Sequence, residues 1–139
     1  MNTASNLTDL TGRVLISAMF LVAGLGKIGG YAGTQAYMEA TGVPGALLPL
    51  VIALEVLGAV AIVVGFRTRI VAAALAGFTL VAALLFHSAD DPMQHLFFMK
   101  NLAVTGGFLF LVARGAGDWS LDARRERLTA PGELVPARG

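Results

Sequence analysis

An apolar run of 21 residues, from Ala46 to Phe66, constrains this chain more than any other feature of its sequence. At a rise of about 1.5 Å per residue, the run makes a helix about 30 Å long, the hydrocarbon thickness of a bilayer. Its one ionisable residue, Glu55, lies near the middle. A carboxylate at that depth is costly unless it is paired, hydrated or protonated. The run therefore predicts a transmembrane helix whose buried acid must be satisfied by other helices.

The composition favours a polytopic membrane protein over a soluble all-α protein. Of the 139 residues, 56% are hydrophobic and only 14% are charged, and the mean hydropathy is +0.74. A soluble domain of this size needs more charge to cover its surface. The chain has no cysteine, which excludes disulfides, thiolate-bound metals and a redox-active cysteine pair. Any redox chemistry would need a borrowed cofactor.

Four apolar segments predict an all-α fold, an antiparallel bundle of four transmembrane helices. The predicted spans are about 10–28, 46–66, 70–87 and 96–113, so the membrane domain covers 10–113. A cleaved signal peptide is the competing interpretation of the first segment, but three further apolar segments follow it. The third span contains the pairs Ala72/Ala76 and Ala73/Gly77, whose spacing lets helix backbones approach closely in lipid.

The segments outside the spans are short. Residues 1–9 form a polar N-terminal tail or the start of a helix, with Thr8 or Asp9 as a possible N-cap. Between the first two spans, the pattern from Thr34 to Gly42 predicts a short helix at the membrane surface. Residues 114–139 form a charged tail in which Trp119 is expected to anchor at the interface.

The arginines predict the orientation of the bundle. With four spans, the N-terminus, the 66–69 turn and the C-terminal tail share one side of the membrane. That side carries all eight arginines, namely Arg13, Arg67, Arg69, Arg114, Arg124, Arg125, Arg127 and Arg138, whereas the other side has only Lys27 and Lys100. The positive-inside rule therefore predicts a multi-pass membrane protein with both termini in the cytoplasm.

Five polar residues fall at the middle of the bilayer or in its outer half. They are the candidate ligand-binding residues: Lys27, Glu55, His87, Lys100 and Asn101. Helix periodicity places the three charged ones on faces that carry small residues, which mark helix contacts. These side chains are therefore expected to point into the bundle. Two lysines facing one glutamate leave a surplus positive charge, which could bind an anionic or carbonyl-bearing head group unless one lysine deprotonates.

Each of these residues also has a purely structural interpretation. Arg13 and Lys27 could snorkel at span ends, and Glu55 could form only a structural ion pair with Lys27 or Lys100. His87 could be an interfacial histidine, and Asn101 could simply bridge helices. Haem ligation by His87 and His95 is disfavoured because Asp-Asp-Pro interrupts the helix between them. The histidine and acid spacing gives no metal site, and no nucleic-acid-binding pattern is present.

Over residues 10–123 the chain resembles the DoxX family of small four-helix bacterial inner-membrane proteins. The resemblance rests on the order and spacing of several short motifs. They are Arg13, GLGK at 24–27, ATGVP at 40–44, the span containing Glu55, GFRTR at 65–69, MKNLAVTGG at 99–107 and GAGDWSLD at 115–122. The last 17 residues match no pattern of the family. By this resemblance, Arg13, Lys27, Glu55, Lys100 and Asn101 would line the bundle interior, without established catalytic roles.

The resemblance implies redox-associated functions, because family members are similar to a subunit associated with a quinol oxidase or are linked to membrane redox complexes. The leading hypothesis is a quinone- or lipophile-binding subunit of a membrane oxidoreductase system, with quinone as the candidate cofactor. Glu55 would accept a proton while Lys27 and Lys100 hold the head group. The alternative is a non-catalytic scaffold or assembly factor, and a transporter is a weaker third. Expected partners are membrane lipid, other oxidoreductase subunits and further copies of the chain.

Overall fold

The computed structural model describes residues 2–87 and 90–130, and within them all regular structure is helical. Four long helices are apolar enough to cross a membrane, which confirms the predicted fold class. These are α1 (Thr3–Gly29), α3 (Leu48–Val64), α4 (Thr68–Phe86) and α5 (Pro92–Arg114). Three shorter elements complete the fold: α2 (Tyr31–Ala40), the 3₁₀ turn η1 (Gly45–Leu47) and α6 (Leu121–Thr129).

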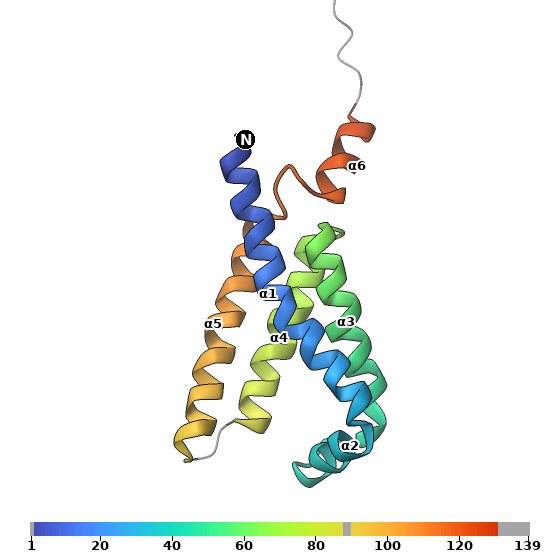
Figure 1. Cartoon of the computed structure of the whole chain (residues 1–139), viewed down its shortest axis with the longest axis vertical. Helices are drawn as coiled ribbons and strands as arrows, with labels where there is room; N and C mark the ends of the chain where they lie inside the picture. The colour runs from blue at the N-terminus through green and yellow to red at the C-terminus, as the bar shows by residue number, and fades with distance from the viewer. Residues whose placement is uncertain (1, 88–89, 131–139) are drawn as a thin grey trace, which may run out of the picture.

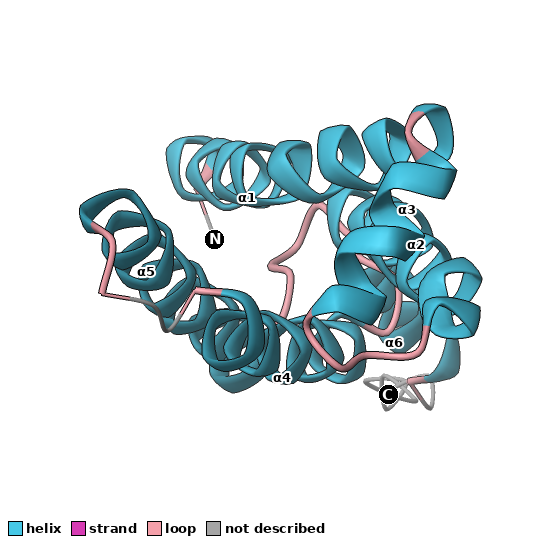
Figure 2. Cartoon of the chain, turned by 90° about the horizontal axis from the view of Figure 1, so that it is seen from below, coloured by secondary structure: helices cyan, strands magenta, loops and turns pink. Residues whose placement is uncertain are grey.

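The four long helices run antiparallel to their neighbours in sequence, so the bundle has two chemically different ends (Figure 1). One end carries the start of α1, the α3–α4 turn, the end of α5 and α6, and we call it the arginine-rich end. The other end carries α2 and we call it the α2 end. The most extensive packing is between α1 and α3 and between α4 and α5 (Figure 2). A smaller contact between α3 and α4 connects these two pairs. The cytoplasmic location of the termini stays a prediction.

An apolar core separates the two ends. It contains Phe20, Ala59, Ile62, Ala72, Leu75, Ala76 and Phe108. The rings of Phe20 and Phe108 meet edge to face, with centroids 5.2 Å apart, and so join α1 to α5. The pair Ala72/Ala76 is buried as its spacing predicts. Gly77 packs against nothing within 4 Å of where its Cβ would lie, so the Ala73/Gly77 pair is no helix contact.

Four helices, α1, α2, α4 and α5, begin earlier than the sequence indicated, and the difference is largest for α1 and α5. The N-cap of α1 is Asn2, whose side chain accepts a hydrogen bond from the Ser5 amide, and not Thr8 or Asp9. The N-cap of α5 is Asp91, which accepts hydrogen bonds from two backbone amides of the first turn. Because α5 begins at Pro92 and not near residue 96, Lys100 and Asn101 lie about two turns inside the helix.

The short helix predicted between the first two spans is present as α2, but it covers Tyr31–Ala40 and not Thr34 to Gly42. The chain turns away after α2 at Gly42, whose φ of +82° is the left-handed conformation that glycine adopts without strain. The ring of Tyr37 stacks on Phe86 at the end of α4, with centroids 5.5 Å apart. The helix is thereby fixed across the end of the bundle.

Arg13 ties three segments together and does not snorkel. Its side chain is 1% exposed. Its Nη1 donates hydrogen bonds to the carbonyl oxygens of Ile62 and Val63 at the end of α3, at 3.3 and 2.6 Å. Its Nη2 donates to the Trp119 carbonyl at 2.6 Å. The last carbonyls of a helix have no partner within that helix, so one guanidinium caps α3 and holds the segment before α6.

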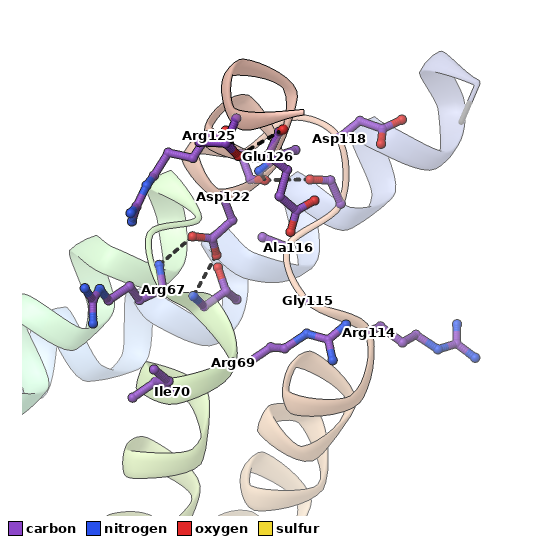
Figure 3. A pocket seen from close by; sticks show the side chains of 15 residues that line it. Arg67, Arg69, Ile70, Arg114, Gly115, Ala116, Asp118, Asp122, Arg125 and Glu126 are labelled. Carbon is purple, nitrogen blue, oxygen red and sulfur yellow. Dashed lines mark hydrogen bonds between the residues drawn. The ribbon is translucent and has the colours of Figure 1, made fainter. Parts of the chain in front are cut away.

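The segment after α5 is more ordered than the predicted charged tail. The Asp122 carboxylate accepts hydrogen bonds from the amides of Arg67 and Thr68, at 2.7 and 2.8 Å (Figure 3). The Asp122 amide donates to the Gly65 carbonyl at 2.9 Å. The acid therefore caps the start of α4 and clamps α6 to the α3–α4 turn. It also holds Arg67 in the left-handed conformation, with a φ of +45°. Trp119 is 47% exposed, and its anchoring at the membrane interface stays a prediction.

We predict that replacing Asp122 by asparagine loosens this clamp. The amides of Arg67 and Thr68 would lose a charge-assisted acceptor, and their protection against hydrogen exchange should fall about tenfold. Hydrogen–deuterium exchange of the protein in detergent measures this directly. Glu126→Gln is the control, because its side chain is exposed on the same helix and holds neither amide. Equal protection in the two variants would contradict the clamp.

The clamp should also depend on pH. Burial alone would raise the pKa of the Asp122 carboxyl, but the hydrogen bonds from Thr68 and Arg67 and the charge of Arg125 hold it below its ordinary value of 3.8. A depressed pKa contributes stability that is complete above the unfolded value and is lost as the pH falls through the folded value. Protection of the two amides should therefore persist to below pH 3.8 in the native chain.

Candidate functional site

The centre of the candidate site is an ion pair between α1 and α3. Lys27 Nζ lies 2.9 Å from each carboxylate oxygen of Glu55. Only the Oε1 contact has hydrogen-bond geometry, so Oε2 is buried without a hydrogen-bond partner. The Glu55 side chain is 5% exposed and that of Lys27 is 27% exposed. Lys27 therefore neutralises the charge of the Glu55 carboxylate, and Oε2 keeps its capacity to accept a hydrogen bond.

The ion pair forms because α1 and α3 approach closely at Gly24. A Cβ at Gly24 would lie 2.7 Å from Val56 Cγ2 and 3.1 Å from Glu55 Cβ, so only glycine fits there. Lys27 follows Gly24 by three residues, on the same face of α1. The glycine thus sets the distance between the helices, and the lysine side chain reaches across to the acid.

The pair lies in the wall of a pocket of about 450 Å³ at the α2 end of the bundle. The helices α1 to α5 all contribute residues to its lining. Its polar members include Lys27, Thr34, Tyr37, Glu55, His87, Lys100 and Asn101. Its apolar members include Phe20, Met38, Val51, Phe78, Leu85 and Phe86. An apolar pocket with a few convergent polar groups is the usual form of a small-molecule site.

The polar residues of α4 and α5 complete the pocket. Lys100 has no carboxylate partner among the described residues, and its Nζ lies 5.5 Å from the centroid of the Phe97 ring. The Nδ1 of His87 is 2.7 Å from Gln94 Oε1, and its ring contacts Phe97. Asn101 is buried. The pocket therefore keeps one positive charge beyond the neutral Lys27–Glu55 pair.

The structure brings together all five residues proposed from the sequence as ligand-binding, since each lines this pocket. Their roles stay predictions. Arg13 and Trp119 lie at the opposite, arginine-rich end. The sequence missed the contribution of α2, where Thr34 and Tyr37 line the pocket. The signal was the pair of tyrosines in an interfacial segment, which indicated a membrane surface and not a pocket wall. No group of histidine, cysteine or acidic residues in the described part of the chain could hold a metal.

Comparison with known proteins identifies the family. The DoxX family model matches residues 8–88, from the first turns of α1 to the end of α4. The chain belongs to the DoxX family. The matched DoxX region contains Lys27, Glu55 and His87, while Lys100 and Asn101 on α5 lie beyond it.

Several named proteins are similar to this DoxX chain. The inner membrane protein YqjF of Escherichia coli (strain K12) is 55% identical over 114 residues, which cover 81% of this chain and 88% of YqjF. The inner membrane protein YphA of the same strain is 35% identical over 123 residues, or 83% of this chain and 88% of YphA. A third relative carries the name "Putative oxidoreductase CatD" in Bacillus subtilis (strain 168) and is 33% identical over 94 residues, or 68% of this chain and 69% of CatD.

No solved structure matches this DoxX chain. The family, the inner membrane location of its relatives and the four apolar helices together make it a multi-pass inner membrane protein.

We predict that Gly24→Ala weakens the bundle and separates the ion pair. The added methyl group would meet the stiff side chain of Val56, and such overpacking costs about 1–3 kcal/mol. Gly26→Ala is the matched control, because nothing lies within 4 Å of its Cβ position and alanine favours a helix. Thermal unfolding in detergent should show a lower midpoint for Gly24→Ala only. A fall of equal size in Gly26→Ala would contradict the close approach.

Proposed function

We propose that this DoxX-family protein binds a lipophilic molecule with a compact polar head group in the pocket at the α2 end, as a subunit of a membrane oxidoreductase system. The observation that carries the proposal is the pocket itself, an apolar space of about 450 Å³ with Lys27, Glu55, Lys100 and Asn101 in its wall. Pockets of about 300–1,000 Å³ take ring-sized ligands. A quinone ring has that size, and its tail would remain in the surrounding lipid.

The charges favour a head group that accepts hydrogen bonds. Lys27 is paired with Glu55, whereas Lys100 has only an aromatic contact and no described acid partner. Lys100 is an exposed residue in the wall of the pocket, and an ammonium without a carboxylate partner attracts a carbonyl or an anionic oxygen through charge-assisted hydrogen bonds. Asn101 adds an amide that can donate to a second oxygen. Two carbonyl groups on one ring, as in a quinone, would suit these two donors.

Glu55 supports a further role in proton exchange. Its Oε2 has no hydrogen-bond partner, although the ammonium of Lys27 lies 2.9 Å away. A carboxylate oxygen with spare acceptor capacity can receive the hydroxyl proton of a reduced, quinol-like ligand. The chain has no cysteine of its own, so electrons would pass to a redox centre in a partner subunit. The proposal is therefore one of binding and proton acceptance.

The name of one relative agrees with the proposed association with an oxidoreductase. The protein named "Putative oxidoreductase CatD" is 33% identical to this chain over 94 residues. We extend the oxidoreductase association to this chain as part of the proposal.

The alternative is a non-catalytic scaffold or assembly factor for a redox or stress-response complex. The observation that favours it is the direct Lys27–Glu55 pair, because two charges that satisfy each other need no ligand. Buried ion pairs and close glycine contacts can serve only to fix which helices pack together. The two proposals differ in what the pocket should contain when the protein is isolated.

The test is to purify the protein in mild detergent, extract it with organic solvent and quantify quinones by mass spectrometry. The native chain should carry about one quinone per protein, and Lys27→Ala/Lys100→Ala should carry none. The single variant Lys100→Gln should lose most of the quinone while keeping the Lys27–Glu55 pair that stabilises the fold. His95→Gln is the matched control, a polar residue of the same helix that does not line the pocket.

Two results would contradict the binding proposal. One is the absence of quinone or any other stoichiometric lipophile from the native protein, which would favour the scaffold. The other is equal retention by the native chain and both lysine variants, because the ligand would then lie elsewhere.

A further inference from the structure

The helices α3 and α4 diverge from their turn toward the α2 end, and the ion-pair pocket reaches between them. Near the turn the two helices touch, because a Cβ at Gly58 would lie 3.2 Å from both methyl carbons of Leu75. Nearer the α2 end, Val51 on α3 and Ala82 on α4 both line the pocket. The contact between α3 and α4 is accordingly smaller than the contacts of α1 with α3 and of α4 with α5.

Three aliphatic side chains on this side line the pocket and are also exposed on the outside of the bundle. Leu47 of η1 is 45% exposed, and Val81 and Leu85 of α4 are 53% and 49% exposed. Val81 lies five residues before Phe86, the last residue of α4, which is about 7.5 Å along the helix axis. Apolar side chains therefore connect the pocket to the lipid-facing surface. We call this opening, bounded by Leu47, Val81 and Leu85, the α3–α4 window.

The lysines and the amide of the pocket come from the opposite side of the bundle. The long helices contact one another in the order α1, α3, α4, α5, so the α1–α5 side faces away from the window (Figure 2). Lys27 belongs to α1, and Lys100 and Asn101 belong to α5. The pocket thus offers polar groups on one side and an apolar opening on the other. This arrangement suits a ligand with a polar head group and an apolar tail.

The size of the pocket requires a long tail to leave it. A volume of about 450 Å³ has room for a ring-sized head group, and a long hydrocarbon tail does not fit in the same space. The α2 end is covered by α2, whose Tyr37 ring stacks on Phe86. The window is apolar and opens beside the membrane-crossing part of α4. A tail that leaves through the window enters the hydrocarbon of the bilayer.

We propose that the ligand of this pocket is a membrane lipid with a long hydrocarbon tail, which enters from the bilayer through the α3–α4 window and keeps its tail there. The inference rests on the proposed function and narrows its substrate class, because a water-soluble molecule without a tail would have no use for the window. The head group reaches Lys27 and Lys100, and the tail passes Val81 and Leu85 into the lipid.

The test compares two probes that share one head group. One is ubiquinone with its isoprenoid tail, and the other is the same dimethoxy-methyl-benzoquinone ring without a tail. Each is titrated into the detergent-solubilised protein, and bound molecules are counted by native mass spectrometry. Val81→Trp and Leu85→Trp place an indole in the window. Each should weaken binding of the tailed quinone about tenfold, because the tail must displace the indole. The ring without a tail should bind both variants as tightly as it binds the native chain.

Leu80→Trp is the matched control. It adds the same indole to α4 at a residue that is 39% exposed and does not line the pocket, so binding of both quinones should be unchanged. Equal binding of the tailed quinone by the native chain and all three variants would overturn the window and leave the proposed function intact. A loss of both quinones together in Val81→Trp and Leu85→Trp would also overturn it, because the tail would then make no difference.

Two further outcomes would contradict the inference in other ways. If the native chain bound neither quinone, the quinone-binding function itself would fail, and the window would fail with it. If the two window variants changed the oligomeric state of the protein and left binding of both quinones unchanged, the window would be an interface between copies of the chain. Native mass spectrometry reports the oligomeric state in the same measurement.

Discussion

The Lys27–Glu55 ion pair is the interaction on which the rest of the structure depends. A carboxylate in the middle of a membrane helix would be strongly destabilising alone, and its partner must come from another helix. That requirement brings α1 against α3, with Gly24 removing the side chain that would hold them apart. The remaining helices then enclose the pair, and α2 lies across the end of the bundle. Stability and a polar pocket thus arise from the same contact.

The two polar ends of the bundle are separated by an apolar core. At the α2 end, one ion pair and one further lysine line a largely apolar pocket. At the arginine-rich end, Arg13 caps α3 and Asp122 caps α4, so both ends of the α3–α4 turn are held by side chains from distant segments. The Phe20–Phe108 contact lies between the two. The two ends of the bundle therefore differ in the polar groups that they present.

The sequence predicted the helices better than their polar contacts. Hydropathy and length are local properties, which is why the four spans and the short helix after the first were predicted from the chain alone. The small residues around Lys27 and Glu55 also indicated that these side chains point inward, as they do. The same pattern predicted an inward Lys100, which is exposed. The partner of Arg13 could not be predicted, because carbonyl acceptors at the end of another helix leave no pattern in the sequence.

Two other contacts between distant parts of the chain could not be predicted from the sequence either. Helix α6 is short and polar, and it is held by Asp122 through backbone amides that lie more than 50 residues away in the chain. Lys100 was expected to be equivalent to Lys27, yet it contacts an aromatic ring of its own helix and not the acid. Which of two lysines pairs with one glutamate depends on helix packing, and the DoxX family membership does not decide it either.

A double-mutant cycle on Lys27 and Glu55 tests the central claim most directly. Thermal or denaturant unfolding in a membrane-mimetic detergent would be measured for the native chain, Lys27→Met, Glu55→Gln and the double variant. The account predicts that each single variant is destabilised and that the double variant loses less than their sum, with a coupling energy of about 1–3 kcal/mol. Additive effects would mean that the two side chains do not interact in the folded protein, and would contradict the account.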